Sequence, residues 1–348
     1  MQVLARHRPA SSPPGPLPGS AHQHARQREL LAFGVARYRD ARAARVRRYR
    51  VRSVILVTGA TGRVGYHLME ALADAHADVA AMVRVEARAA DLPGTAQHVV
   101  ATFDNPPPAE VLRGYDRVFL LSPAIEEQAE LETVFIDALL AAGHGPHVVK
   151  IAADGFADPG CEVRFMLSHR QVAAHLEAVG LPVTYLAPAL YMEDLLAAAD
   201  TIRDEAAICV PAGHGRVGFV AASDIAAVAA RVLTSPGHEG ATYVVTGPEA
   251  LRFKDVAARI SAVFAREVDY TDQPLGRARE LMLAGGLSPW KADGNLELFD
   301  WIRQGGADTV TATVRELTGA DARPVEDWLE ESRASFLAPT PGLPPSAF

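Results

Sequence analysis

From Val54 onward, short apolar runs alternate with longer amphipathic stretches. The apolar runs predict strands at 54–58, 78–83, 97–101, 117–121, 147–152 and 183–187. The amphipathic stretches predict helices at about 63–76, 126–142 and 166–179. Strands that alternate with helices form a parallel sheet with right-handed crossovers. We therefore expect an α/β fold, with a Rossmann-type doubly wound sheet of six parallel strands as its core.

Beyond Pro188 the alternation loosens. We expect a helix at 190–204, short strands within 208–220, a capped helix from Ser223 to Leu233, a strand at 242–245, a helix at 253–265 and mostly helix at 274–332. These elements predict a smaller C-terminal α+β cap over the carboxyl ends of the strands. The expected division is an N-terminal extension (1–52), a core (53–188), a cap partly interleaved with the core (189–337) and a disordered tail (338–348).

The turn after the first strand carries three glycines, at positions 59, 62 and 65. Glycine lets the backbone turn sharply and approach a ligand closely. The helix that follows points free N–H groups and its positive dipole end at the turn, which suits a pyrophosphate. The core is therefore predicted to bind a dinucleotide, and a glycine-rich turn without a ligand is the alternative. The predicted contacts are Gly59, Thr61, Gly62, Arg63, Val64 and Gly65.

Further cofactor contacts are predicted where other strands end. Arg84 follows the second strand, where a Rossmann fold holds the adenosine ribose, and an Arg there can pair with a 2′-phosphate. We therefore expect NADP, with NADPH preferred over NADH; the alternatives are a contact through Arg88 and a solvated Arg84. Ser122 and Pro123 should lie beside the ribose and nicotinamide, and Pro188 near the carboxamide. Each of these could instead be an ordinary strand-end turn.

Charge is distributed unevenly along the chain. Residues 1–52 carry twelve Arg against two acids, a net charge of +10, so the remainder carries −18 of the overall −8. The acidic body should not attract nucleic acid. The basic extension has three interpretations: an arm for nucleic acid or an anionic membrane, an organelle transit peptide, or a start placed upstream of the native one.

The rest of the composition excludes several classes of protein. Cys161 and Cys209 are too few and too far apart for a disulfide framework or a zinc site, so no metal is expected. No run of 18 apolar residues predicts a transmembrane helix, and the N-terminus lacks the apolar region of a secretory signal. We expect a cytoplasmic monomer or homodimer that acts on a small molecule and binds neither membrane nor nucleic acid through its body.

The glycine turn, opening as Val57-Thr58-Gly59-Ala60-Thr61-Gly62, resembles the short-chain dehydrogenase/reductase superfamily. Typical members use Tyr-x-x-x-Lys, in which the Lys lowers the pKa of the Tyr so that it can exchange a proton with the substrate. None of the eight tyrosines here has a Lys four residues later. The usual Ser of the fifth strand is also missing, because Lys150-Ile151 is followed by Ala152-Ala153.

Three further stretches resemble the NmrA-like group of atypical members: residues 147–153, 168–188 and 215–226. The group more often carries Arg where Ala187 stands. The resemblance implies a relative of NADPH-dependent quinone and triphenylmethane dye reductases, of isoflavone-type reductases, or of NmrA regulators, which bind the dinucleotide without turning it over.

The same resemblance suggests a catalytic residue. In the isoflavone-type branch a Lys acts from the helix before the sixth strand, and His169 holds that position here. A His with a pKa near neutrality could donate a proton to the substrate or orient it; the alternative is a His packed at a helix start. Large apolar side chains should line an aromatic substrate pocket, although each could be plain packing. They are Phe156, Tyr191, Met192 and Trp290.

These observations favour a soluble NADPH-dependent reductase that transfers hydride to a small apolar or aromatic acceptor of the quinone, enone or imine type. Quinone-like acceptors need little acid catalysis, which would explain the missing Tyr-x-x-x-Lys pair. Two alternatives remain open. One is a redox-sensing regulator that binds the dinucleotide and acts on a partner. The other is a biosynthetic enzyme that holds the dinucleotide structurally and performs a non-redox step.

Overall fold

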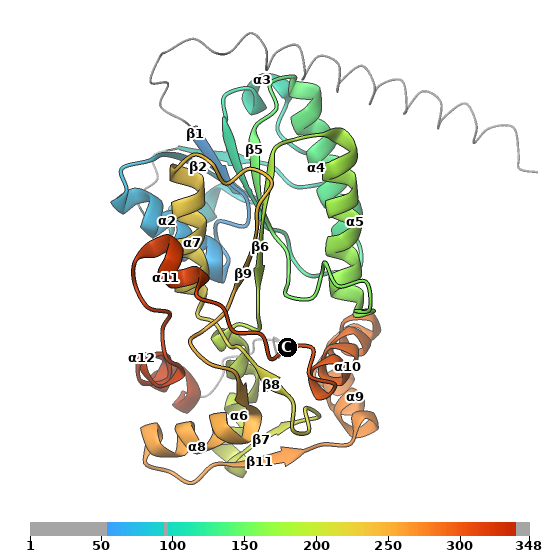
Figure 1. The fold of residues 1–348 in the computed structure, drawn as a ribbon, viewed down its shortest axis with the longest axis vertical. Helices are drawn as coiled ribbons and strands as arrows, with labels where there is room; N and C mark the ends of the chain where they lie inside the picture. The colour runs from blue at the N-terminus through green and yellow to red at the C-terminus, as the bar shows by residue number, and fades with distance from the viewer. Residues whose placement is uncertain (1–53, 94–96, 339–348) are drawn as a thin grey trace, which may run out of the picture. The chain divides into compact units, whose positions relative to one another are not determined.

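A computed structural model of the chain describes residues 54–93 and 97–338 (Figure 1). The predictions for the N-terminal extension and for the tail beyond Ala338 lie outside these residues. All six predicted core strands are present, each within two residues of its expected bounds, and a seventh joins them. The strands are β1 (Val54–Val57), β2 (Asp78–Val83), β3 (Gln97–Val100), β4 (Arg117–Leu120), β5 (His147–Ile151), β6 (Val183–Pro188) and β9 (Thr242–Val245).

The sheet is parallel throughout, with the strand order β3-β2-β1-β4-β5-β6-β9. The order reverses between β1 and β4, which is the point where doubly wound sheets bind dinucleotides. The sheet has one strand more than the six predicted, because β9 pairs with β6 and places Tyr243 beside Leu186. The sequence did not reveal this pairing, because more than fifty residues separate the two strands.

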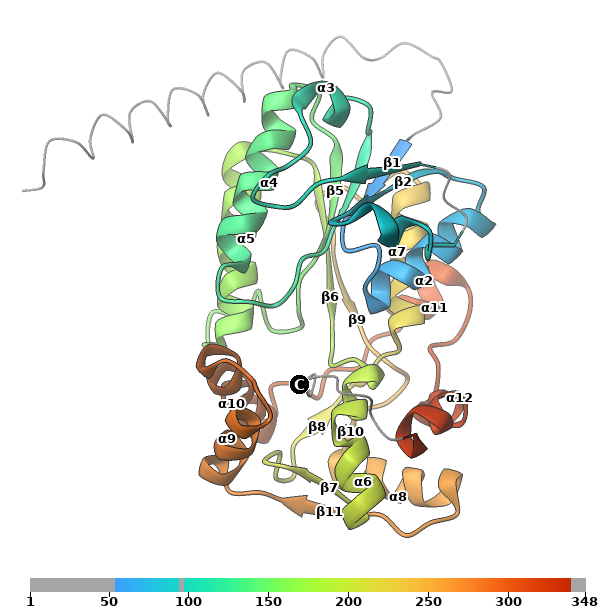
Figure 2. The same ribbon diagram turned by 180° about the vertical axis from the view of Figure 1, so that it is seen from behind.

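Helices cover both faces of the sheet (Figures 1 and 2). The longer ones, α4 and α5, pack side by side on one face, whereas α2 and α7 pack together on the other. The predicted Rossmann-type architecture is confirmed. The elements of these layers are α2 (Arg63–Asp74), η1 (Glu86–Ala89), α3 (Ala109–Leu112), α4 (Gln128–Ala142), α5 (Arg164–Val179), α7 (Ala222–Thr234) and α11 (Thr313–Thr318).

The remaining elements gather beyond the carboxyl ends of the strands, in the lower half of Figure 1. They include two small sheets, in which β7 pairs in parallel with β11 and β8 pairs antiparallel to β10. This α+β cap faces the strand ends at which the cofactor contacts are predicted. Its elements are η2 (Met192–Ala198), α6 (Ala199–Glu205), β7 (Ala207–Val210), β8 (Arg216–Val217), β10 (Leu251–Arg252), α8 (Phe253–Phe264), β11 (Asp269–Asp272), α9 (Leu275–Ala284), α10 (Pro289–Arg303) and α12 (Val325–Leu337).

The start of α7 differs from the prediction. The sequence suggested a helix capped by its own Ser223, but the helix begins one residue earlier and no side chain at its N-cap, Ala221, can cap it. The Glu193 carboxylate does so instead, accepting from the Ala222 N–H with both oxygens at 3.1 Å. A carboxylate at this end also complements the helix dipole. Glu193, which belongs to η2 of the α+β cap, therefore connects that cap to helix α7 of the core.

Three further features concern residues 54–93 and 97–338. None of their helices is both long and apolar enough to cross a membrane. Among the same residues, no group of three His, Cys, Asp or Glu side chains converges on a position that could hold a metal ion. Both cysteines are free thiols, and burial raises the pKa of each above its usual value.

Candidate active site

The glycine turn packs directly against the helix that follows it. Gly59 has a φ of +64°, and a Cβ there would lie 2.8 Å from the carbonyl oxygen of Leu121. A Cβ at Gly65 would lie only 2.1 Å from the carbonyl oxygen of Gly59. Only glycine fits these two positions, and the close approach brings the start of α2 to the switch point of the sheet.

The N-terminus of α2 is suited to an anion. Its N-cap residue is Gly62, which has no side chain that could cap the helix. The first N–H groups of a helix have no intrahelical partner and carry the positive end of the dipole. These backbone groups fit the pyrophosphate of a dinucleotide. The roles predicted for Thr61 and the glycines stay predictions.

Arg84 and Arg88 differ in whether their guanidinium groups are already paired and so in how readily they could bind a 2′-phosphate. Arg84 is exposed directly after β2, and the described residues provide no ion pair for it. Arg88 lies on η1, where its Nε is 3.9 Å from the Asp91 carboxylate. Of the two candidates for a 2′-phosphate, Arg84 is thus the one whose guanidinium remains available.

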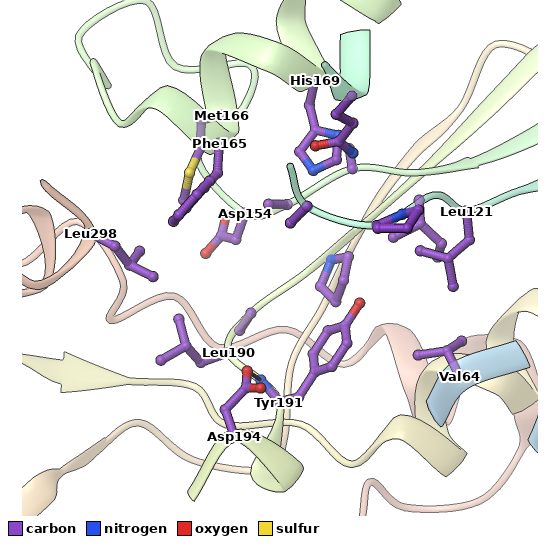
Figure 3. Close-up of a pocket in the computed structure, with 18 of the residues that line it drawn as sticks. Val64, Leu121, Asp154, Phe165, Met166, His169, Leu190, Tyr191, Asp194 and Leu298 are labelled. Atoms are coloured by element: carbon purple, nitrogen blue, oxygen red, sulfur yellow. Dashed lines mark hydrogen bonds between the residues drawn. The ribbon is translucent and has the colours of Figure 1, made fainter. Parts of the chain in front are cut away.

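A cavity of about 500 Å³ opens between the strand ends and the cap (Figure 3). Val64 and Leu121 line the end nearest the glycine turn, and Leu298 lines the end in the cap. Arg63, Ser122, Pro123 and Pro188 also line it, so these predicted cofactor contacts surround one space. The rest of the described wall is formed by Ala124, Gln128, Ile151, Ala152, Ala153, Asp154, Phe165, Met166, His169, Ala189, Leu190, Tyr191, Asp194, Lys291, Trp301 and Ala307.

Of the four residues predicted for the substrate pocket, Tyr191 lines this cavity, and Figure 3 shows its hydroxyl pointing inward. The other three are absent from its described wall. Phe156 is buried against Tyr185, with ring centroids 5.4 Å apart. Met192 is 1% exposed in the core because the chain turns into η2 there. Trp290 packs edge-on against Phe165 at 5.3 Å and so lies behind a residue that does line the cavity.

His169 reaches the cavity from α5 and is the outer end of a buried polar chain. Its Nδ1 lies 3.3 Å from the Nζ of Lys150, on β5. Lys150 in turn forms an ion pair of 3.2 Å with Glu132, on α4. The hydroxyl of Ser122 donates to the other Glu132 oxygen at 2.5 Å. This row of polar side chains therefore links the turn after β4 to α5, the helix that carries His169.

The two charged side chains of this polar row, Glu132 and Lys150, are both fully buried. Glu132 is 0% exposed and Lys150 is 1% exposed. Burial lowers the pKa of Lys150, while the Glu132 carboxylate opposes that shift. Sequence analysis noted Lys150 but assigned no role to it or to Glu132. One signal was present: a lone Lys within an apolar strand must find a buried partner, because an unpaired charge there is very costly.

The surroundings of His169 differ from one expectation. A pKa near neutrality was expected, but burial, and secondly the Lys150 charge, lower the pKa of His169 well below its usual value. An ammonium can only donate hydrogen bonds, so Nδ1 must accept from it. The ring proton therefore resides on Nε2. At neutral pH, His169 is a neutral imidazole with one N–H to offer.

A second polar cluster on the cavity wall is centred on Asp194, which lies below Tyr191 in Figure 3. The Arg63 guanidinium donates to the Asp194 carboxylate at 2.7 Å, joining the glycine-turn helix to the cap. Lys291 places its Nζ 4.4 Å from the centroid of the Phe165 ring. Burial lowers the pKa of Lys291, and the nearby Asp194 opposes this shift. None of these pairings was visible in the sequence.

The chain matches the NmrA-like family over residues 51–291. This match covers more than half of the chain and most of the residues that line the cavity. The chain belongs to the NmrA-like family. The relationship suggested by the glycine turn and by the stretches around β5, β6 and α7 is thereby confirmed.

Two relatives of this NmrA-like chain match it over nearly their whole length. It is 32% identical to an NAD(P)H azoreductase of Xenophilus azovorans, covering 82% of this chain and all of the relative. It is 33% identical to a (4-alkanoyl-5-oxo-2,5-dihydrofuran-3-yl)methyl phosphate reductase of Streptomyces griseus, covering 81% and 99%. Among solved structures, the NADPH complex of an Escherichia coli quinone oxidoreductase shares the fold, with a TM-score of 0.72 at 23% identity over 80% of this chain and 99% of the other.

Proposed function

We propose that this chain is an NADPH-dependent reductase that delivers hydride to a small apolar or aromatic acceptor of the quinone, enone or imine type. The relatives named above are NAD(P)H-dependent or act as reductases, and they span most of the chain. The NADP preference rests on the available guanidinium of Arg84.

One observation carries the proposal: the same cavity is lined by five of the predicted cofactor contacts and by apolar side chains at its cap end. Val64 and Leu121 line the end nearest the glycine turn (Figure 3), and Ser122 and Pro188 also line the cavity. Apolar side chains of α5 and α10, Met166 and Leu298 among them, line the other end (Figure 3). A ligand at each end would therefore share one space with a mostly apolar wall, which is an arrangement that suits hydride transfer.

The chain's own residues would orient and polarise the acceptor. When bound, the reduced nicotinamide supplies the hydride. His169 would donate its Nε2–H to the oxygen or nitrogen on which negative charge develops, and Lys150 holds the ring in that tautomer. A fixed neutral donor of this kind stabilises charge without being consumed.

Tyr191 provides a second hydroxyl in the same wall. Burial, followed by Asp194 and Glu193, raises the pKa of Tyr191 above its usual value, so the phenol stays protonated. Tyr191 could therefore donate a hydrogen bond but could not act as the tyrosinate of a Tyr-x-x-x-Lys pair. This division of roles agrees with acceptors that need little acid catalysis.

The test is consumption of NADPH, followed by absorbance, with a panel of quinones, enones and imines. The proposal expects turnover with at least one class of acceptor. Tight binding of both oxidised and reduced cofactor without oxidation of NADPH by any acceptor would overturn it. That result would favour the redox-sensing regulator.

His169→Ala sharpens the test by removing the proposed donor. We expect kcat to fall more than about tenfold, within the range for groups that assist proton or charge transfer. Because the pKa of His169 is lowered, kcat of the wild type should show no His titration between about pH 6 and pH 8. His175→Ala is the matched control, since His175 also lies on α5 but contacts Asp137 of α4 at 2.8 Å and is not part of the described cavity wall. Unchanged kcat in His169→Ala would remove His169 from the mechanism.

A further inference from the structure

We propose that Lys291 is a nucleophilic amine that binds an apolar aldehyde covalently, as an imine, inside the cavity. The inference goes beyond the proposed function, because imine formation needs neither NADPH nor the transfer of a hydride. It assigns a role to a cavity side chain that the proposed mechanism does not use.

Lys291 stands in an unusual place for a lysine. It is the third residue of α10, and its backbone N–H donates to the side chain of the N-cap residue Ser288 at 3.2 Å. The first turn of a helix favours acidic side chains, because the positive end of the dipole lies there. The half-buried side chain lines the cavity, with Nζ over the ring of Phe165. The helix end and the apolar wall both disfavour the ammonium form, and the face of a Phe ring offsets this only in part.

The carboxylate that acts most on Lys291, Asp194, is already engaged by other groups. Its Oδ1 accepts from the Arg63 guanidinium at 2.7 Å, and its Oδ2 accepts from the Tyr191 N–H at 3.3 Å. Across residues 54–93 and 97–338, Lys291 forms no ion pair. An amine that no carboxylate pairs loses its proton more readily than a paired one.

The surrounding charges favour the neutral amine as well. Burial lowers the pKa of Lys291; the Asp194 carboxylate opposes this shift, and the Arg63 guanidinium adds to it. A Lys in an apolar pocket beside another cation is an arrangement that makes the amine nucleophilic. Lys150 differs, because its ammonium is paired with Glu132 and only 1% of the residue is exposed.

The condensation balances without a cofactor. The lone pair of Nζ attacks the carbonyl carbon of the aldehyde, which forms a C–N bond. Both hydrogens of the neutral amine then leave with the carbonyl oxygen as water, and C=N replaces C=O. Water reverses this step, and the apolar side chains of Phe165, Met166 and Leu298 in the same wall disfavour the reversal (Figure 3). The volume of about 500 Å³ is in the range of small-molecule sites and admits an aromatic aldehyde.

Reductive trapping tests the site on the full chain, without NADPH. The chain is incubated with 2-naphthaldehyde and cyanoborohydride, and peptide mapping by mass spectrometry locates the label. Lys254 is the internal reference among the three lysines, because it also lies in the first turn of a helix, α8, but is exposed. At neutral pH we expect Lys291 to be labelled at least about tenfold faster than Lys254, because more of it is neutral. Its labelling rate should also level off at a lower pH.

Two charge variants should change the labelling of Lys291 in opposite directions. Asp194→Asn removes the carboxylate that favours the ammonium form, so labelling should become about threefold faster. Arg63→Met releases Asp194 to pair with Lys291, so labelling should become about tenfold slower. Lys291→Arg keeps the positive charge and should take no label at this position, because a guanidinium does not lose its proton. Lys254→Met is the matched control and should leave the labelling of Lys291 unchanged.

Labelling of Lys291 no faster than that of Lys254, or slower labelling in Asp194→Asn, would overturn the inference. The comparison of the two lysines within the wild type holds even where a variant does not fold. This failure is distinct from failure of the proposed function. No label on Lys291, with continued NADPH oxidation by a quinone, would reject the imine site alone. Preferential labelling of Lys291, with no NADPH oxidation by any acceptor, would reject the reductase and leave the imine site in place.

Discussion

The two ends of the cavity are built in different ways. The pyrophosphate part of the cofactor end lies in one contiguous segment, from β1 through the glycine turn into α2, and its fit is a property of the backbone. The acceptor end depends on side chains brought together from α4, β5, α5 and the cap. A glycine turn can therefore be recognised from a few consecutive residues, and it indicates the cofactor class. The groups that would determine the chemistry are distributed along the chain.

The physical constraints at the two ends differ as well. At the cofactor end they are steric, since an added Cβ at Gly65 would overlap the backbone of the turn. At the acceptor end they are electrostatic, because Glu132 and Lys150 are buried and depend on each other. A steric constraint limits which residues are tolerated at one position. An electrostatic constraint couples several positions, so variants at the two ends should behave differently when they are combined.

The largest effect should come from breaking the buried ion pair. Lys150→Met keeps the length of the side chain but leaves the Glu132 carboxylate buried without its cation. We expect the free energy of unfolding, measured by urea denaturation, to fall by about 3–5 kcal/mol. A fall of less than about 1 kcal/mol would mean that the pair contributes no more than an exposed one.

The double variant Lys150→Met/Glu132→Gln is the control for that experiment. It removes both charges, and replacement of a whole buried pair is often neutral or stabilising. We expect it to recover most of the lost stability while kcat stays low, because His169 would lack the donor to Nδ1. If the double variant were as unstable as the single one, packing at Lys150 rather than its charge would explain the loss.

A smaller effect, confined to the cofactor end, is expected from Gly65→Ala. Its Cβ would lie 2.1 Å from the carbonyl oxygen of Gly59, so the turn and the start of α2 must move apart. We expect NADPH to bind at least about a hundredfold more weakly in a fluorescence titration, roughly 2.7 kcal/mol. Gly276→Ala is the matched control, because a Cβ there meets nothing within 4 Å. Unchanged affinity in Gly65→Ala would mean that the cofactor does not use this turn.

The same contrast explains what the sequence could predict. The strands, the helices, the family and the glycine turn follow from local patterns, since each occupies a few consecutive residues. The pairing of β9 with β6 and the capping of α7 by Glu193 depend on contacts across long stretches of chain, so no local pattern carries them. The same holds for the Glu132–Lys150–His169 chain. Met192 and Tyr191 illustrate the limit, because adjacent residues point to the core and to the cavity respectively.

The smallest effect should distinguish the two candidates for the 2′-phosphate. Arg84→Ala removes an exposed guanidinium that solvent screens, so we expect NADPH to bind only about tenfold more weakly while NADH binding is unchanged. Arg88→Ala is the control: Arg88 already faces Asp91, so it should affect neither cofactor. An equal loss for NADPH and NADH in Arg84→Ala would place its contact on a part that both share. A selective loss of NADPH in Arg88→Ala alone would move the phosphate contact from the end of β2 to η1, and would mean that the ion pair with Asp91 opens when the cofactor binds.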